Sequence, residues 1–276
     1  MDYIELSVIV EPKEQGSDVL IAQLAELQFE SFLETDLGFN AYIQAKDYNE
    51  RQLNLTFSFY TDFFKIKHTT TLIPKQNWNK EWENNFKPID IDGICYIRAP
   101  FHDEKEGFKY NIIIEPKMSF GTGHHHTTQL MIKKLMQLDI ENKTILDMGC
   151  GTGVLAIMAS MKGAGTITAI DIDQWSYENT NENLQKNNIK NVCVYKGDAQ
   201  LISDKLFHTI LANINKNILL ADFKKYTTSL EKSGNLIISG FFETDINELK
   251  NKAIELGLTF VDKTVQEQWT VLHFTN

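Results

Sequence analysis

The chain has 276 residues and a formal net charge of −10 at pH 7. Its 42% hydrophobic and 23% charged residues predict a globular protein rather than a disordered one. The acidic balance argues against nucleic acid as the main partner, because phosphate binding favours a basic surface, and it would speed encounter with a basic protein. No apolar run approaches the roughly 20 residues that span a bilayer, no signal-peptide pattern opens the sequence, and three scattered cysteines argue against a disulfide scaffold. We expect a cytoplasmic protein.

The first 75 residues alternate between strand and helix patterns. Period-two alternation predicts strands over residues 3–10, 40–47 and 64–73. Helical spacing of apolar residues predicts helices over residues 18–29 and 49–60. This order predicts a small two-layer α+β domain over residues 1–75. It contains no glycine-rich loop and no cluster of catalytic residue types, so we expect it to bind or position a partner.

A tryptophan-rich segment opens the predicted connection between domains, residues 76–115. Trp78, Trp82 and Phe86 lie four residues apart, so a helix would put the three rings on one face. Residues 89–115 have the pattern of short strands with a charged turn between them. We interpret the whole segment as a linker region whose aromatic helix packs between the domains.

From residue 143 onward the pattern becomes regular. Strands are predicted at residues 144–149, 166–171, 191–196, 207–213, 234–239, 257–263 and 268–274. Helices are predicted at residues 153–162, 174–188, 216–230 and 243–256. This alternation predicts an α/β domain over residues 116–276, with a seven-stranded, doubly wound, Rossmann-like sheet whose last two strands pair antiparallel.

Residues 145–157, ILDMGCGTGVLAI, place three glycines where a predicted strand turns into a helix: Gly149, Gly151 and Gly153. Glycine in regular structure costs roughly 0.5–1 kcal/mol relative to alanine. Three together indicate a backbone that passes close to something bulky and offers its N–H groups to it. Ligands of such sheets bind at the carboxyl ends of the strands. Asp171 ends the next strand, where a carboxylate typically accepts hydrogen bonds from the two hydroxyls of a ribose.

Two classes of nucleoside ligand fit this turn. Residues 151–156, GTGVLA, match the dinucleotide pattern G-x-G-x-x-[GA], which leaves a nicotinamide-dependent oxidoreductase open. The longer stretch DMGCGTG starts at Asp147 and is followed by Asp171 at the end of the next strand. That pair resembles the first two motifs of the S-adenosylmethionine-dependent methyltransferases. Asp198, after the third strand, stands where that class contacts the adenine.

Two further segments resemble the PrmA family, whose members methylate the eleventh protein of the large ribosomal subunit. They are EPKMSFGTGHHHTT at residues 115–128 and LANINKNIL at residues 211–219. The stretches WNKEWENNFKP and EQWTVLHF are similar to that family too. The resemblance implies S-adenosylmethionine as the cofactor and a ferredoxin-like N-terminal domain that recognises the substrate. By the family's pattern the cofactor contacts are Thr128, Gly149, Asp171 and Asn213.

The candidate cofactor-binding set is larger than the family's four positions. The glycine turn adds Gly151, the adenine side adds Asp198, and the glycine-rich loop before residue 124 adds Phe120 as an apolar cover. Gly121 and Gly123 are expected to act as hinges of that loop, like the ends of a lid.

Methyl transfer from a sulfonium is an in-line displacement that alignment and exclusion of water can accelerate. An attacking lysine must be neutral, although the pKa of a free lysine is about 10.4. Burial beside the positively charged sulfonium lowers that pKa, so we expect no dedicated base. Acceptor groups must orient the amine, and the candidate catalytic residues are Asn213 and Ile214, the latter through its backbone carbonyl. Asn215 could make a second polar contact.

Other polar groups in these motifs are expected to be structural. His124, His125 and His126 do not share one face and have no spaced carboxylate or cysteine beside them, so we expect no metal site. Cys150 is expected to fill space inside the glycine turn, and Asp147 to brace it. Either Thr127 or Thr128 is expected to cap a helix that begins near residue 129.

The combined prediction is an S-adenosylmethionine-dependent methyltransferase that modifies lysine side chains, or the N-terminal amine, of a ribosomal protein of the large subunit. Three alternatives stay open: a nicotinamide-dependent oxidoreductase, a small-molecule methyltransferase, and a non-enzymatic module that keeps the fold. We expect a monomer that makes no direct contact with nucleic acid or a membrane.

Overall fold

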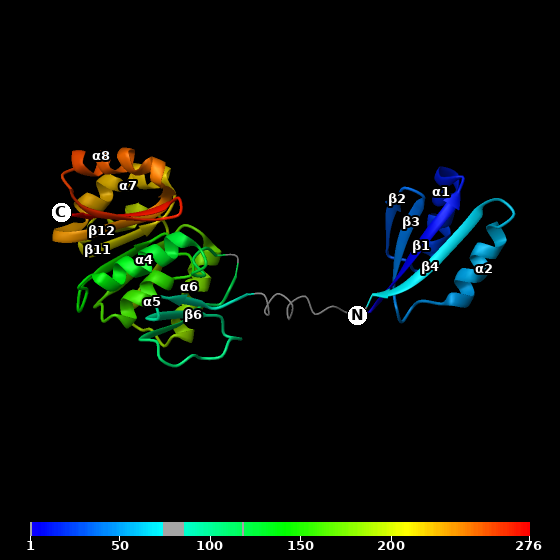
Figure 1. The fold of residues 1–276 in the computed structure, drawn as a ribbon, viewed down its shortest axis with the longest axis horizontal. Coiled ribbons are helices and arrows are strands. Elements are labelled where there is room, and N and C mark those ends of the chain that lie inside the picture. The colour runs from blue at the N-terminus through cyan, green and yellow to red at the C-terminus, as the bar shows by residue number, and fades with distance from the viewer. Residues whose placement is uncertain (1, 74–85, 118) are drawn as a thin grey trace. The chain divides into compact units, whose positions relative to one another are not determined.

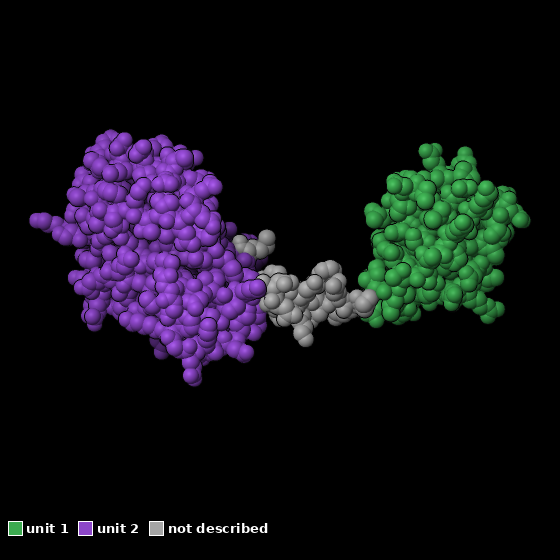
Figure 2. Space-filling view, in the orientation of Figure 1, with its two compact units in different colours: residues 1–85 green, residues 86–276 purple. Residues whose placement is uncertain are grey.

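The computed structural model describes residues 2–73, 86–117 and 119–276 (Figure 1). The chain divides into two compact units, residues 1–85 and 86–276 (Figure 2). Most of the predicted aromatic helix, including Trp78 and Trp82, lies outside the described residues. None of the helices in the described ranges has the length and apolar composition to cross a membrane.

The smaller unit is an antiparallel sheet with two helices packed on it. Its elements are β1 (Tyr3–Glu11), α1 (Lys13–Glu26), β2 (Ser31–Thr35), β3 (Gly38–Gln44), α2 (Glu50–Tyr60) and β4 (Lys65–Ile73). The strands lie in the order β2-β3-β1-β4, all antiparallel. Alternation along β1 buries Leu6 and Val8 against Leu24 of α1 and Leu53 and Phe57 of α2.

Sequence reasoning missed one strand of this unit and misplaced one helix. The missed strand, β2, lies at the sheet edge. None of its five side chains is fully buried, and its sequence therefore lacks the alternation of apolar residues that predicts a strand. Helix α1 begins at Lys13, earlier than the predicted residue 18, because its first turn is polar and carries no apolar periodicity.

The larger unit is built on a seven-stranded sheet. Its strands are β8 (Ile145–Met148), β9 (Ile167–Asp171), β10 (Val192–Lys196), β11 (Phe207–Asn213), β12 (Leu230–Phe242), β13 (Thr259–Gln266) and β14 (Trp269–Thr275). They lie in the order β10-β9-β8-β11-β12-β14-β13. The first five are parallel, and β14 runs antiparallel to both β12 and β13. The predicted α/β fold with a large, mostly parallel sheet is confirmed.

Helices cover both faces of this sheet (Figure 1). One face carries α4 (His126–Gln137), α5 (Val154–Met161) and α6 (Gln174–Lys186), and the other carries α7 (Lys216–Thr228) and α8 (Ile246–Glu255). Two short 3-10 helices, η1 (Ala199–Ile202) and η2 (Glu243–Asp245), complete the unit. Alternating side chains divide the core, so that Leu211 of β11 packs with α4 and α5 while Ile210 and Ala212 pack with α7 and α8.

Residues 86–115 belong to the larger unit, which differs from the predicted linker boundaries. Three short strands form there: β5 (Ile89–Ile91), β6 (Cys95–Arg98) and β7 (Tyr110–Ile113). Ile91, Ile97 and Ile112 are buried in the same core as α4 and α5. Burial of these apolar side chains holds the segment against the larger unit.

Candidate functional site

A cavity of about 580 Å³ opens at the carboxyl ends of the parallel strands, where ligands of open α/β sheets bind. Strand order arranges its lining, from Asp198 after β10, past Asp171 of β9 and Asn213 of β11, to Trp269 at the start of β14. The predicted site residues that line it are Phe120, Gly149, Gly151, Asp171, Asp198, Asn213 and Ile214.

Thr128 is the one predicted site residue that is not among those lining the cavity. Its neighbour Thr127 lines the cavity instead. The Thr128 Oγ1 is buried and has no hydrogen-bond partner within the described residues. Its assignment as a cofactor contact stays a prediction.

The glycine turn has no side chains at Gly149 and Gly151 because other segments of the protein pack against these residues. Gly149 has φ +70° and Gly151 has φ +55°, the left-handed region that strains other residues. A Cβ on Gly149 would collide with the Ile214 side chain, and one on Gly151 with the Phe120 carbonyl. The expectation that the turn offers its N–H groups to a ligand is wrong for these two, since Gly149 donates to the Ile170 carbonyl and Gly151 to Asp171 Oδ2 at 2.8 Å.

Asp171 joins the glycine turn to the start of α6. Its Oδ2 accepts the Gly151 N–H, and its Oδ1 accepts the Asp173 N–H at 3.0 Å. Each carboxylate oxygen has two acceptor sites, so both retain capacity for a further donor from the cavity. The side chain therefore braces the turn and can still accept two hydroxyl groups.

Asn213 ends β11 with an unused acceptor. Its Oδ1 is buried and has no hydrogen-bond partner within the described residues, an arrangement that costs free energy unless a ligand donates to it. The next residue, Ile214, donates its N–H to the Ser239 carbonyl at 3.1 Å. The Ile214 carbonyl packs against Gly240, and a Cβ at residue 240 would collide with it. Asn215 caps α7 by accepting the Ile218 N–H at 3.2 Å, so its predicted polar contact is a helix cap.

The loop before α4 is tied to the glycine turn. The Thr152 N–H donates to the Phe120 carbonyl at 2.9 Å, and the Thr152 hydroxyl donates to the Gly121 carbonyl at 2.7 Å. The Phe120 side chain stays 54% exposed at the cavity wall, where an apolar cover was predicted.

Helix α4 begins at His126 and its cap is His125, not one of the predicted threonines. The His125 Nδ1 accepts the Thr127 N–H at 3.3 Å. Because a backbone N–H can only donate, the neutral ring carries its proton on Nε2. Burial, together with the neighbouring His126, lowers the pKa of His125, which favours that neutral form.

Aromatic rings line the end of the cavity toward β14. The His125 ring meets Trp269 edge-on at 4.5 Å between centroids and Phe120 at 5.2 Å. Trp269 also packs on Phe242 at 4.3 Å. Sequence reasoning missed His125 and Trp269 as site residues, although both stand in the segments GHHHTT and EQWTVLHF that it singled out.

The three consecutive histidines face different partners. His124 contacts the Lys87 carbonyl, His125 caps α4, and His126 contacts Gln266 and Glu267. Within the described ranges the structure brings together no group of three histidine, cysteine, aspartate or glutamate side chains that could hold a metal ion.

Comparison with known proteins decides the family. The family model described as ribosomal protein L11 methyltransferase (PrmA) matches residues 6–276. The chain belongs to this family. It is 41% identical over 278 residues to the ribosomal protein L11 methyltransferase of Phocaeicola vulgatus, with 99% of both chains covered. The corresponding protein of Porphyromonas gingivalis is 43% identical over 265 residues, covering 95% of this chain and 91% of that one.

A solved structure agrees with this membership. The ribosomal protein L11 methylase of Lactobacillus delbrueckii subsp. bulgaricus superposes with a TM-score of 0.65 and 27% identity, covering 68% of this chain and 98% of that one. The nicotinamide-dependent oxidoreductase and the small-molecule methyltransferase, which the sequence left open, are not supported by these comparisons.

The methyl donor of this PrmA-family protein is S-adenosylmethionine, as predicted. When bound, it supplies an electrophilic methyl group on a sulfonium. The cavity residues fit such a group, because Gly149 and Gly151 line the cavity without side chains. The Asp171 carboxylate keeps free acceptor sites, and the buried Asn213 Oδ1 has no donor among the described residues.

Asp147 braces the turn from inside the protein. Its Oδ2 accepts the Ala156 N–H at 3.0 Å, at the start of α5, while its Oδ1 is buried without a partner in the described chain. Burial raises the pKa of the Asp147 carboxyl to about 7, and nearby Asp171 adds to the shift.

Asp147→Asn should therefore remove a pH dependence of stability. The folded-state pKa is about 7 and the unfolded-state value about 3.9, so between them only the folded protein keeps the proton. The contribution of Asp147 to the free energy of unfolding is largest below about pH 4. It falls by about 4 kcal/mol as the pH rises through about 7. Urea unfolding at several pH values checks this, comparing the wild type with Asp147→Asn. An equal slope for both proteins over this window would refute the assignment.

Proposed function

We propose that this protein transfers methyl groups from S-adenosylmethionine to amino groups of ribosomal protein L11, namely lysine side chains or the N-terminal amine. Two relatives that are 41% and 43% identical to this chain carry the name ribosomal protein L11 methyltransferase. The observation that carries the amine assignment is the buried, unpartnered Oδ1 of Asn213 in the cavity wall. An ammonium or amine donor is a natural partner for that oxygen.

The proposed cofactor contacts divide along the strand ends. Asp171 would accept the ribose hydroxyls, Asp198 would face the adenine, and the bare turn at Gly149 and Gly151 would receive the body of the nucleoside. Phe120 would cover the site from the loop, and Thr128 would contribute from the start of α4. Asn213 would serve both the cofactor and the reacting amine.

The amine must lose its proton before it attacks. At pH 7 this requires roughly 4–5 kcal/mol for an ordinary lysine. The first proton would leave to solvent water. Asn213 Oδ1 and the Ile214 carbonyl would then accept the remaining amine protons and orient the lone pair, and a bound sulfonium would favour the neutral amine. No strong base is needed in this scheme, because orientation and exclusion of water carry the acceleration.

The smaller unit is proposed to be a ferredoxin-like domain that recognises the protein substrate. Its βαββαβ order and the sheet order β2-β3-β1-β4 support this. The connection to the methyltransferase domain is proposed to lie within residues 76–115, ahead of the part, residues 86–115, that packs in the larger unit. The net charge of −10 suits a basic ribosomal protein as substrate. We propose that the protein acts as a cytoplasmic monomer without direct contact to nucleic acid.

The experiment is methyl transfer to purified L11. The protein is incubated with S-adenosylmethionine carrying a labelled methyl group and with either L11 or an unrelated basic protein of similar size. We expect label on L11 alone, and mass spectrometry of its peptides should place the methyl groups on lysine or the N-terminal amine. Label on arginine or glutamine, or equal label on the unrelated protein, would contradict the proposal.

A further inference from the structure

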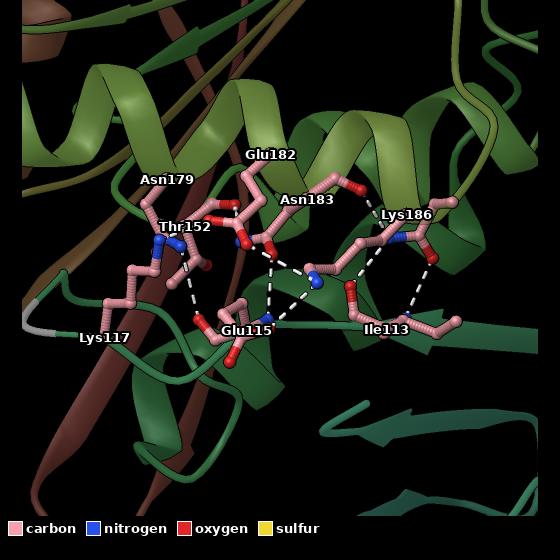
Figure 3. Close-up of polar contacts among 9 residues, drawn as sticks. Ile113, Glu115, Lys117, Thr152, Asn179, Glu182, Asn183 and Lys186 are labelled. Atoms are coloured by element: carbon pink, nitrogen blue, oxygen red, sulfur yellow. Dashed lines mark hydrogen bonds and ion pairs between the residues drawn. The ribbon is translucent and has the colours of Figure 1, made fainter. Parts of the chain in front are cut away.

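Two asparagines of α6 and a third at its C-cap hold the chain segment that leads into the site loop; Figure 3 labels the first two, Asn179 and Asn183. Asn179, Asn183 and Asn187 are spaced by four residues, so their side chains project along one stripe of the helix. They pair with the extended backbone of Ile113 and Glu115 as a neighbouring strand would.

The three terminal amides contact the segment in different ways. Asn187 accepts the Ile113 N–H at 2.8 Å and donates to the Ile113 carbonyl at 2.7 Å. Asn183 accepts the Glu115 N–H at 2.8 Å, and Asn179 donates to the Glu115 carbonyl at 3.3 Å. Ion pairs from Lys186 to Glu115 and from Lys117 to Glu182 flank this contact. The backbone thus stays bonded where it leaves β7.

Asn183 differs from the other two because it also reaches the glycine turn. Its Nδ2 donates to the Thr152 carbonyl at 2.9 Å, and its side chain is fully buried. One amide therefore joins the Glu115 backbone to the Thr152 backbone (Figure 3).

Thr152 completes the connection to the loop over the cavity. Its carbonyl is held by Asn183, its N–H by the Phe120 carbonyl and its hydroxyl by the Gly121 carbonyl. The adjacent Gly151 carbonyl accepts from the Thr180 hydroxyl at 2.8 Å, again from α6. Every polar group of Thr152 is thereby used to set the loop against the turn.

We propose that Asn183 is a positioning residue that sets the loop carrying Phe120 against the glycine turn, and so pre-forms the S-adenosylmethionine pocket. It acts through Thr152 and does not itself line the cavity. The inference rests on the proposed cofactor site. A pocket held in its binding shape before the ligand arrives binds more tightly, because less ordering remains to be done on binding.

Asn183→Asp tests this with Asn187→Asp as its matched control. In Asn183→Asp one carboxylate oxygen still accepts the Glu115 N–H, but the other replaces the donor that faces the Thr152 carbonyl. Asn187→Asp places a similar defect one helical turn away, against the Ile113 and Asn183 carbonyls, with no contact to the glycine turn. The midpoint temperature of thermal unfolding should be lower in both variants than in the wild type, since both lose buried donors.

The deciding measurement is the affinity for S-adenosylhomocysteine by calorimetry. We expect Asn183→Asp to raise Kd by about tenfold, the size of one lost hydrogen bond, and Asn187→Asp to stay within about twofold. Hydrogen exchange of the amides from Phe120 to Gly123 should accelerate in the first variant alone. Thr152→Val, which loses only the hydroxyl bond to the Gly121 carbonyl, should raise Kd in the same direction, and it carries the test if Asn183→Asp does not fold.

Two results would overturn the inference, and they are distinguishable from failure of the cofactor site itself. Equal Kd changes in Asn183→Asp and Asn187→Asp would mean that Asn183 contributes to the stability of the fold and does not position the loop. Unchanged Kd in both Asn183→Asp and Thr152→Val would mean that the connection does not shape the pocket. A wild-type protein that does not bind S-adenosylhomocysteine would overturn the proposed cofactor site, and this inference with it.

Discussion

Replacing Asp171 by alanine is expected to weaken binding of S-adenosylhomocysteine by about 100-fold, while the protein stays folded. Each hydrogen bond to a charged acceptor contributes roughly 1.5–3 kcal/mol, and a ribose would form two. Part of the loss has a second origin, because the same carboxylate accepts the Gly151 N–H and holds the glycine turn. Isothermal titration calorimetry gives the affinity, and thermal unfolding reports whether the fold is kept.

Two further variants serve as controls for this result. Asp171→Asn keeps one acceptor oxygen and should lose about tenfold in affinity. Asp204→Ala removes the same charge from an exposed position and should leave the affinity unchanged. An Asp171→Ala protein that binds as tightly as the wild type would show that the ribose lies elsewhere.

Gly149→Ala is expected to abolish most methyl transfer, with a fall of at least about 100-fold in kcat/KM. The new Cβ would collide with the Ile214 side chain, so the turn or the Asn213–Ile214 segment must move. Small displacements of positioning groups reduce rates strongly. Left-handed strain adds about 1–2 kcal/mol of destabilisation, which urea unfolding would detect.

Gly93→Ala is the matched control for that strain. Gly93 has φ +66°, close to the +70° of Gly149, but a Cβ there would meet nothing within 4 Å. It should lose about 1–2 kcal/mol of stability through the backbone alone and keep its methyl-transfer rate. If the two alanine variants lost activity equally, the collision with Ile214 would not be the cause.

The elements that sequence reasoning found are those whose signal is local. The glycine turn, the acid that ends β9 and the asparagine that ends β11 each follow an apolar strand pattern, and the parallel sheet brings strand ends to one edge. This topology rule places the glycine turn and Asp171 at one site from the sequence, whereas the role of Asn213 came from the resemblance to the PrmA family.

The features that it missed depend on contacts distant in sequence. His125 and Trp269 are separated by the whole sheet in chain order, and their ring contact exists only because β14 lies beside β12. The helix cap at His125 escaped notice because threonine is a far commoner cap than histidine. The close neighbours of the glycine turn, Ile214 and Phe120, likewise come from other segments.

Strand β14 lies between β12 and β13, although it follows both in the chain. During synthesis, β12 and β13 therefore emerge from the ribosome before the strand that separates them, and pairing them directly at that stage would be a wrong arrangement. Nascent chains that expose unpaired strand edges are prone to association. The wall that contains Trp269 forms only once residues 269–275 have been made, so the pocket stays incomplete while β12 and β13 are the last strands to have emerged.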